Sequence, residues 1–392
     1  MSRRDRAIAF FGLTPEIVAV STSMFLLGCG ENLWRRFLPK YLEALGAPIT
    51  AIGAFGTAED FLDGVFQYPG GWVADRYGRR FALILFVCLA ALGYVVYWAL
   101  PSWPIAFVGL ALVMAWTSMA SPTLFAVVGD ALPKSKRTMG FTVQSILRRV
   151  PIVIAPTIGG FAVAAYGIRA GVRLGLVVSV VMAAITIGVV SRLRIPIVPD
   201  DAPITLRHVW RAFPRSLRWL LVSDVFIRTC EGLVDVFLVL YAINVVGIGA
   251  PGFGIMIATQ ALTTILVQIP AARVAERTGK KPFVTATFIA FALFPIGVAI
   301  SKSFTLLLVA FIVGGLRELG EPARKALIID FAAPALRGRV VGLYYLCRSM
   351  AIAPAAFVGG LLWRVNPALP FYVAGAMGFA GVAAFVITVE EA

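Results

Sequence analysis

The sequence predicts an all-α integral membrane protein in which twelve transmembrane helices form two pseudo-symmetric halves of six. Its 392 residues are 60% hydrophobic and 14% charged, with a mean hydropathy of +0.89, which is too apolar for a soluble fold. Apolar stretches continue for about 20 residues or more, the length that a helix needs to cross a bilayer, whereas a β-barrel would show short alternating segments. The second half of the chain also repeats the first, which predicts the pairing of halves.

Turn residues and charges divide the chain into twelve predicted spans. These cover residues 17–42, 48–72, 82–100, 104–129, 141–166, 171–191, 219–245, 251–272, 283–301, 304–329, 340–363 and 368–388. The first residues are basic, but they lead into a span that holds Glu31 and Arg35, and no small-residue cleavage site follows a short apolar core. We therefore expect an uncleaved first helix.

The positive charge is distributed by side of the membrane. The net charge is +15, and 21 Lys and Arg residues fall in the segments 3–6, 76–80, 134–137, 192–218, 273–281 and 337–339. The intervening loops hold five, which are Lys40, Arg169, Arg173, Lys302 and Arg364. This asymmetry predicts a multi-pass protein of the inner (plasma) membrane with both termini in the cytoplasm. Because the charge is explained by topology, we expect the lipid bilayer and no nucleic acid as a partner.

An internal repeat predicts the domain organisation. Cys29 recurs 201 positions later as Cys230, and Pro122, Arg137 and Gly160 are among the residues that recur after 200 positions. We therefore expect a six-helix bundle over 1–191, a cytoplasmic linker over 192–218 and a second bundle over 219–392. An even number of spans inserts both copies in the same orientation, so the halves are parallel repeats with a cavity between them.

The predicted linker contains a basic amphipathic segment, ITLRHVWRAFPRSLRW. Leu206, Val209 and Phe213 fall on one helical face, and Arg207 and Arg211 lie outside it, as in an interfacial helix. Two interpretations stay open. The segment is a hinge or lipid-sensing linker, or it is a tether whose basic face lies on anionic headgroups.

The sequence does not favour an enzyme. Its four cysteines all fall inside predicted spans, and the single histidine, His208, lies outside them. No P-loop, zinc-ligand spacing or nucleophile–base pair is present. We therefore expect no metal, no cofactor and no enzymatic activity.

The stretch GGWVADRYGRR resembles a signature of the major facilitator superfamily, G-x-x-x-D-R-x-G-R-[RK], between the second and third spans. The span count, the duplication and the place of this loop extend the resemblance to the whole chain. It implies the fold of a secondary transporter, which we expect to be a monomer that moves a small-molecule substrate with protons. It also implies that Asp75 faces the end of the eleventh span, within a cytoplasmic charge network that closes the outward-facing state on the inside.

The signature predicts a conformational latch. Gly71 and Gly78 permit close helix approach and a tight turn, and a partly buried Asp75 needs hydrogen-bond donors. The predicted latch comprises Gly71, Asp75, Arg76, Gly78, Arg79, Arg80, Asp130, Glu276, Arg277 and Asp330. In the second copy Ala272 and Arg273 replace Gly71 and Trp72, so that latch is expected to be looser. The alternative is a basic loop that only fixes topology.

Charged residues inside the predicted spans are the best guide to function, because each needs a partner or a wet cavity. In the seventh span Asp224, Arg228, Glu231 and Asp235 follow at spacings that place them on one helix face. Four charged residues lie near predicted span ends, where we expect them to snorkel to water and to have a structural role: Arg36, Asp224, Arg324 and Lys325.

Deeper charges are the candidate site. We expect proton coupling by Glu31, Asp60 or Glu231, and substrate binding by Arg148, Arg348, Gln144, Arg317, Glu318 and Tyr344. The repeat-related Arg148 and Arg348 form a possible clamp for an acidic group. Structural ion pairing is the alternative for all of the charged members of this set.

The fifth span reads APTIGG and resembles the P-x-x-G-G end of a motif associated with proton-coupled antiporters of the same superfamily. Ala155 and Pro151 depart from the glycines of that motif, and Gly159 and Gly160 also suit close helix packing. We expect proton-coupled antiport by alternating access, with efflux as the direction. The alternatives are proton-coupled uptake of a charged or zwitterionic solute, and a flippase for a lysolipid or other amphiphile.

Overall fold

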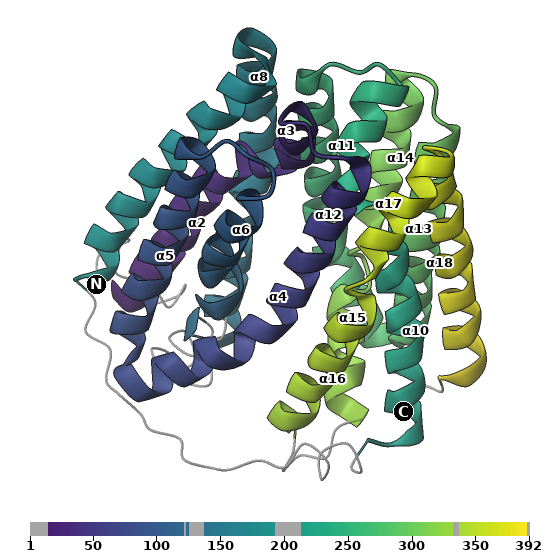
Figure 1. The fold of residues 1–392 in the computed structure, drawn as a ribbon. Helices are drawn as coiled ribbons and strands as arrows, with labels where there is room; N and C mark the ends of the chain where they lie inside the picture. The colour runs from purple at the N-terminus through teal and green to yellow at the C-terminus, as the bar shows by residue number, and fades with distance from the viewer. Residues whose placement is uncertain (1–14, 121–122, 125–136, 193–212, 332–336, 390–392) are drawn as a thin grey trace. The chain divides into compact units, whose positions relative to one another are not determined.

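The computed structural model describes residues 15–120, 123–124, 137–192, 213–331 and 337–389, and these residues are helical apart from turns and short connections (Figure 1). Helices occupy each of the twelve predicted ranges. Among the residues that the structure describes, six helical segments are long and apolar enough to cross a membrane. These are Arg79–Ala99, Arg149–Val190, Ala250–Gln268, Lys281–Ile300, Val340–Val365 and Leu369–Thr388.

The chain forms two compact units. Unit 1 comprises Met1–Gly46 and Leu62–Ala202, and unit 2 comprises Ala47–Phe61 and Pro203–Ala392. The helix α4, Ile49–Tyr77, supplies its first part to unit 2 and its second part to unit 1.

Unit 1 contains the helices of the first half. Their bounds are α2 Pro15–Asn32, η1 Arg35–Phe37, α3 Leu38–Ala44, the second part of α4, α5 Arg79–Ala99, α6 Ala106–Met114, the π-helical turn η2 Ala115–Met119, and α8 Arg137–Val190. The long α8 is two helices, because Gly167 has φ 81 and breaks it between the fifth and sixth predicted spans. Trp34 fills the core, where its Nε1 donates to Ser179 Oγ at 2.9 Å and its ring meets Tyr94 and Tyr97 edge-on.

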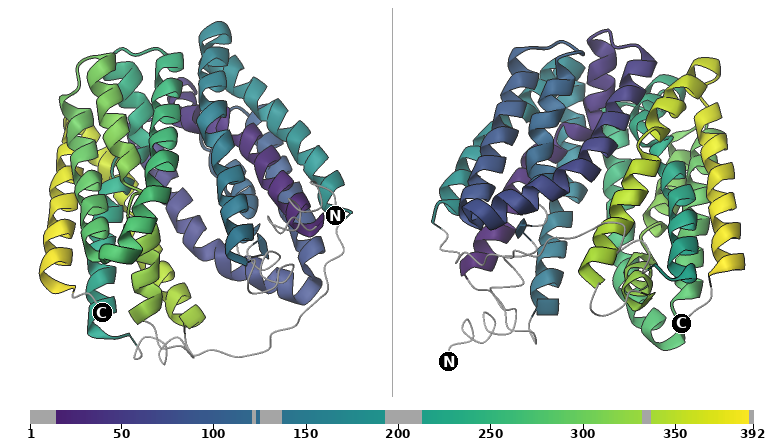
Figure 2. Two further views of the ribbon diagram at one scale, coloured as in Figure 1. Left: turned by 180° about the vertical axis from the view of Figure 1, so that it is seen from behind. Right: turned by 60° about the horizontal axis from the view of Figure 1, so that its bottom comes forward.

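Unit 2 contains the helices of the second half. Their bounds are α10 Arg215–Gly232, η4 Asp235–Phe237, α11 Leu238–Leu240, the π-helical turn η5 Tyr241–Val245, α12 Ala250–Thr278, α13 Lys281–Ile300, α14 Phe304–Leu316, α15 Glu321–Phe331, α16 Arg337–Ile352, α17 Ala355–Val365 and α18 Leu369–Thr388. The helix α18 runs alongside α10 and α13, as both views of Figure 2 show at the yellow end of the chain.

The backbone has matching conformations at equivalent positions of the two predicted repeats. The first helix of each half breaks at the same place, with φ −124 and ψ −29 at Trp34 and φ −123 and ψ −22 at Val234. Gly78 and Gly279 precede the third helix of each half with φ 87 and 99, values that glycine adopts without strain. The glycine of the signature therefore makes the tight turn that was predicted for it.

The glycines of APTIGG serve packing in both halves. A Cβ on Gly159 would lie 1.9 Å from the Leu33 carbonyl oxygen, and one on Gly359 would lie 2.2 Å from that of Leu233. Each glycine thus admits the backbone of the broken first helix of its own half. This geometry favours the packing interpretation of the motif, because the second half has the same contact.

One predicted role belongs to a neighbouring residue. A Cβ on Gly71 would meet nothing within 4 Å, so this glycine does not provide the close helix approach that we predicted. Gly70 does, because a Cβ there would lie 2.3 Å from the carbonyl oxygen of Met119.

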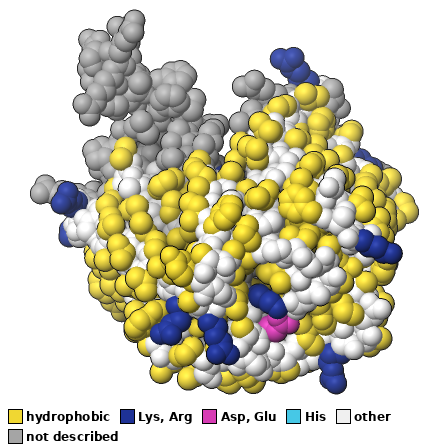
Figure 3. Space-filling view, turned by 90° about the horizontal axis from the view of Figure 1, so that it is seen from above, with side chains coloured by type: hydrophobic (Ala, Val, Ile, Leu, Met, Phe, Trp, Pro, Cys, Tyr) yellow, Lys and Arg dark blue, Asp and Glu magenta, His cyan; other side chains and the backbone are white. Residues whose placement is uncertain are grey.

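Hydrophobic side chains dominate the described surface on the face drawn in Figure 3, where Lys and Arg are scattered. Large apolar residues such as Leu266, Val365 and Ile387 are more than half exposed.

Candidate functional site

Seven charged side chains of unit 2 form a connected set, which we term the charge network. Its members are Asp224, Arg228 and Glu231 of α10, Arg317 at the end of α14, Glu321 and Arg324 of α15, and Arg348 of α16. Every member is at least partly buried, so each ion pair is less screened by water than a surface pair.

Asp224 is the centre of the network. Its Oδ2 accepts from Arg324 Nη1, from the Tyr344 hydroxyl at 3.1 Å and from Arg348 Nη1 at 3.5 Å. Asp224 is 0% exposed and Arg324 is 1% exposed. Our prediction that these two side chains snorkel to water was therefore wrong. The reason is that both turn inward to each other from neighbouring helices.

Glu321 joins Arg324 to Arg228. Its carboxylate accepts hydrogen bonds from Arg324 Nε at 2.9 Å, from Arg324 Nη2 at 2.6 Å and from Arg228 Nη2 at 3.3 Å. Because Glu321 opens α15, its negative charge also lies at the end of the helix where a carboxylate is favoured.

Glu231 forms the other end of the network. Its Oε2 accepts from Arg228 Nη1 at 2.8 Å, and its Oε1 accepts from Arg317 Nη1 at 3.4 Å. Its side chain is 28% exposed, against 1% for Asp224 and 10% for Glu321, so it is the most accessible carboxylate of the network. A proton on Glu231 would remove the charge that two arginines share.

Aromatic rings cover the arginines. The guanidinium groups of Arg228 and Arg317 each lie 5.1 Å from the ring centre of Phe291 in α13, and Arg317 lies 4.4 Å from that of Phe294. These contacts stabilise cations in an apolar setting.

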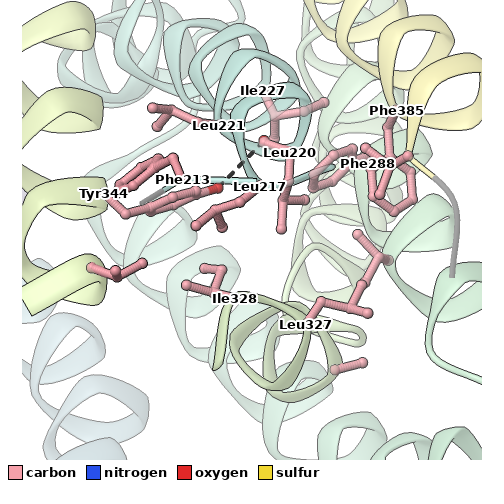
Figure 4. Close-up of a cluster of buried hydrophobic side chains, with 14 of the residues drawn as sticks. Phe213, Leu217, Leu220, Leu221, Ile227, Phe288, Leu327, Ile328, Tyr344 and Phe385 are labelled. Carbon is pink, nitrogen blue, oxygen red and sulfur yellow. Dashed lines mark hydrogen bonds between the residues drawn. The ribbon is translucent and has the colours of Figure 1, made fainter. Parts of the chain in front are cut away.

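The network borders the hydrophobic core of unit 2, part of which is drawn in Figure 4. Leu220 and Ile227 come from α10, and Tyr344 reaches Leu220 from α16, where its hydroxyl donates to the Leu220 carbonyl at 3.3 Å. Tyr344, a predicted substrate-binding residue, is fully buried and holds Asp224 in place.

The network lies where two helices are interrupted. The helix α10 ends at Gly232, one residue after Glu231, and a turn over 317–320 separates α14 from α15. Gly320 makes the second turn possible, because a Cβ there would lie 2.3 Å from the Phe283 carbonyl oxygen. Asp235 lies beyond the first break, so it does not continue the α10 face as the spacing predicted.

The other predicted site residues fall elsewhere. Asp60 is half-buried in unit 2, with its Oδ2 3.7 Å from the Cβ position of Gly232. Glu31 lies in unit 1, is 6% exposed, and accepts from Arg35 at 2.8 Å. Glu318 is half-buried in the turn between α14 and α15. The side chains of Gln144 and Arg148 lie outside the described residues, as does the clamp predicted for Arg148.

The predicted latch is described only in part. The side chains of Asp75, Glu276 and Asp330, and Asp130 entirely, lie outside the described residues. Arg76 lies over Trp72, 5.4 Å from the ring centre. Arg79, Arg80 and Arg277 are described, and the role of the whole set stays a prediction.

Sequence reasoning proposed only part of the network as a site. Glu321 and Arg228 were not among the predicted site residues, although the spacings of three and four residues in Asp224, Arg228 and Glu231 indicate one helix face. Among the described residues, no group of three His, Cys, Asp or Glu side chains is placed to hold a metal ion.

The fold and the site define a class of protein: a multi-pass helical membrane protein built from two repeats, with buried charge beside interrupted helices. The family model described as Major Facilitator Superfamily matches residues 20–245 and 220–392. The chain belongs to the Major Facilitator Superfamily, and it is a membrane transporter rather than an enzyme.

Two relatives extend this result. An uncharacterized MFS-type transporter of Methanocaldococcus jannaschii is 20% identical over 367 residues, which are 92% of this chain and 91% of the relative. The quinolone resistance protein NorA of Staphylococcus aureus is 24% identical over 159 residues, which are 40% of each protein.

Solved structures share the fold. A POT family transporter in complex with 5-aminolevulinic acid has a TM-score of 0.80 at 14% identity and covers 96% of both chains. The nucleoside transporter NupG has a TM-score of 0.78 at 14% identity, and the match covers 96% of this chain and 100% of that one. At these identities the likeness establishes the fold alone.

Proposed function

We propose that the protein is a secondary active transporter that moves a small organic solute together with protons by alternating access. The observation that carries this proposal is the position of Glu231 between Arg228 and Arg317, at 2.8 and 3.4 Å. A carboxylate inside a membrane span that accepts a proton changes the pairing of both arginines, and this changes which groups a solute can contact.

The sign of the charges favours symport of a charged or zwitterionic solute. Protonation of Glu231 frees positive charge, so a negative group and a proton are bound better together than separately. A cationic solute would instead compete with a proton for a carboxylate, and the carboxylates of the network are already bound to arginines. We therefore favour symport over the antiport that we expected from the APTIGG motif.

Antiport with efflux is the second candidate. The similarity over 40% of the chain to a protein named for quinolone resistance supports export. The APTIGG glycines no longer add to it, since they pack against the first helix. For either direction we place the monomeric protein in the plasma membrane with cytoplasmic termini, as the basic segments favour.

The test uses purified protein in proteoliposomes with an imposed pH gradient. Uptake and release of 5-aminolevulinic acid, a dialanine peptide and a quinolone would be followed for the unmodified protein and for Glu231→Gln. We expect Glu231→Gln to abolish accumulation driven by the gradient and to spare exchange of solute for solute. Glu43→Gln is the matched control, because Glu43 pairs with Lys40 outside the network.

Glu31→Gln and Asp60→Asn complete the series, since each carboxyl is a predicted proton carrier. Normal gradient-driven transport in all three variants would show that protons are not carried by these residues. Accumulation of the solute inside vesicles whose proton concentration is higher inside than outside would favour antiport over symport.

A further inference from the structure

We propose that Arg348 is the residue that recognises the solute, and that the solute therefore carries a carboxylate or phosphate group. This inference rests on the proposed function and names the substrate class of the same site. It begins from the charges of the network, whose buried members are four arginines and three carboxylates. Lys325 also contacts Glu321, at 3.6 Å, but its side chain is 57% exposed to solvent. One positive charge is in surplus, and the contacts show which arginine carries it.

The carboxylates are already engaged by the other three arginines. Glu321 receives two nitrogens of Arg324, and Glu231 is shared by Arg228 and Arg317. Arg348 makes one carboxylate contact, at 3.5 Å, to the Asp224 oxygen that already accepts from Arg324 and Tyr344. Arg317 also makes one carboxylate contact, at 3.4 Å, but its Nε donates to the Gly314 carbonyl at 3.0 Å. We therefore assign the surplus charge to Arg348.

The hydrogen bonding of Arg348 is also incomplete. Its Nε is buried and has no hydrogen-bond partner among the described residues. A buried donor left without an acceptor is costly, so a ligand that supplies an acceptor is bound more tightly by this difference. Nε and one Nη of a guanidinium together form the edge that receives both oxygens of a carboxylate or phosphate.

The position of Arg348 suits a ligand-binding group. Its side chain is 17% exposed, whereas that of Arg324 is 1% exposed. Its guanidinium lies 4.6 Å from the ring centre of Tyr345, which covers one face and leaves the planar edges for an anion. Arg324 is thus the structural arginine of the network. The Nε of Arg228 is also buried without a hydrogen-bond partner among the described residues, but both of its Nη atoms contact carboxylates, whereas Arg348 has one carboxylate contact.

The test compares acids with their uncharged esters. Purified full-length protein in phosphatidylcholine nanodiscs would be titrated with 5-aminolevulinic acid, dialanine and a quinolone carboxylic acid, each beside its methyl ester, and the shift in melting temperature measured. We expect at least one acid to bind about tenfold or more tightly than its ester. Arg348→Gln should remove that preference.

Two variants keep the result interpretable. Arg348→Lys retains the charge and loses the paired donors, so it should weaken acid binding while the protein stays folded. It also replaces Arg348→Gln if the latter does not fold. Arg173→Gln is the matched control, since it removes an arginine of unit 1 that lies over Trp98. It should leave the preference for acids unchanged.

The proposal would be overturned if no acid bound better than its ester, or if the preference for acids survived in Arg348→Gln. A response to lysophosphatidylglycerol without a response to any soluble acid would assign the arginine to lipid and also overturn it. The two proposals can fail separately. If an uncharged ester is transported with protons at the same rate by the unmodified protein and by Arg348→Gln, anion recognition is refuted and the proposed function stands.

Discussion

Gly359 is positioned against the Leu233 carbonyl so closely that a Cβ would lie 2.2 Å from its oxygen. Gly159 has the same relationship to Leu33, at 1.9 Å, in the other half. The break in the first helix of each repeat is thus matched by a glycine on the fifth. Glu31 and Glu231 occur two residues before these leucines, at equivalent positions of the repeat.

Substitution of these glycines is expected to destabilise the protein. Gly359→Ala forces a Cβ onto backbone that cannot move without shifting a helix, and overpacking of this kind costs about 1–3 kcal/mol. The measurement is thermal unfolding in detergent. Gly188→Ala is the control, because a Cβ there meets nothing within 4 Å. Equal melting temperatures for the two variants would refute the close contact.

Alanine substitution should also distinguish the two glycines of the signature, Gly71 and Gly78. Gly78→Ala places a side chain at φ 87, which is strained for any L residue, and should lower stability by about 1 kcal/mol or more. Gly71→Ala should be tolerated, since a Cβ there enters open space. A variant series measured by thermal unfolding would contradict this account if Gly71→Ala were the more damaging.

The predicted latch is tested by Asp75→Ala. If Asp75 accepts hydrogen bonds in the inward-closed state, its loss leaves donors unpaired at a cost of roughly 1–3 kcal/mol. Transport should fall while expression and folding survive. Transport equal to that of the unmodified protein would show that the loop only fixes topology.

Much of the fold follows from the sequence because its causes are local or repeated. Apolar length predicted the helical ranges, and the repeat predicted that Gly78 and Gly279 make equivalent turns. The pairing inside the network did not follow, because burial of Asp224 depends on which helix lies opposite. Because Arg324 lies near the end of a predicted span, we expected it to contact water, whereas the structure buries it against Asp224. Choosing Gly70 over Gly71 likewise required knowing where Met119 lies.

The buried pair of Asp224 and Arg324 is expected to govern the stability of unit 2. Arg324→Gln leaves Asp224 with Tyr344 and with distant contacts to Arg348 at 3.5 Å and Arg228 at 4.0 Å. Breaking a buried pair in this way costs about 3–5 kcal/mol. Folding yield and melting temperature are the measurements. Lys325→Gln is the control, because its side chain is 57% exposed and contacts the same helix end at 3.6 Å. A loss as large in the control would show that general charge, rather than the buried pair, matters.

The last prediction concerns the coupling between Glu231 and Arg317, which lie at the ends of two interrupted helices. Their side chains approach to 3.4 Å, and the removal of either leaves the other with an altered set of partners. Glu231→Gln and Arg317→Gln should each lower the melting temperature, and the double variant should lose less than the two changes added together. Residues in direct contact within one network show coupling energies of about 0.5–3 kcal/mol, whereas the effects of distant residues on stability add independently.

A parallel cycle of Glu231→Gln with Arg173→Gln, whose arginine belongs to unit 1, should therefore be additive. Additivity in the Glu231 and Arg317 cycle would mean that the pair contributes nothing specific, and that protonation of Glu231 would not be transmitted to α14.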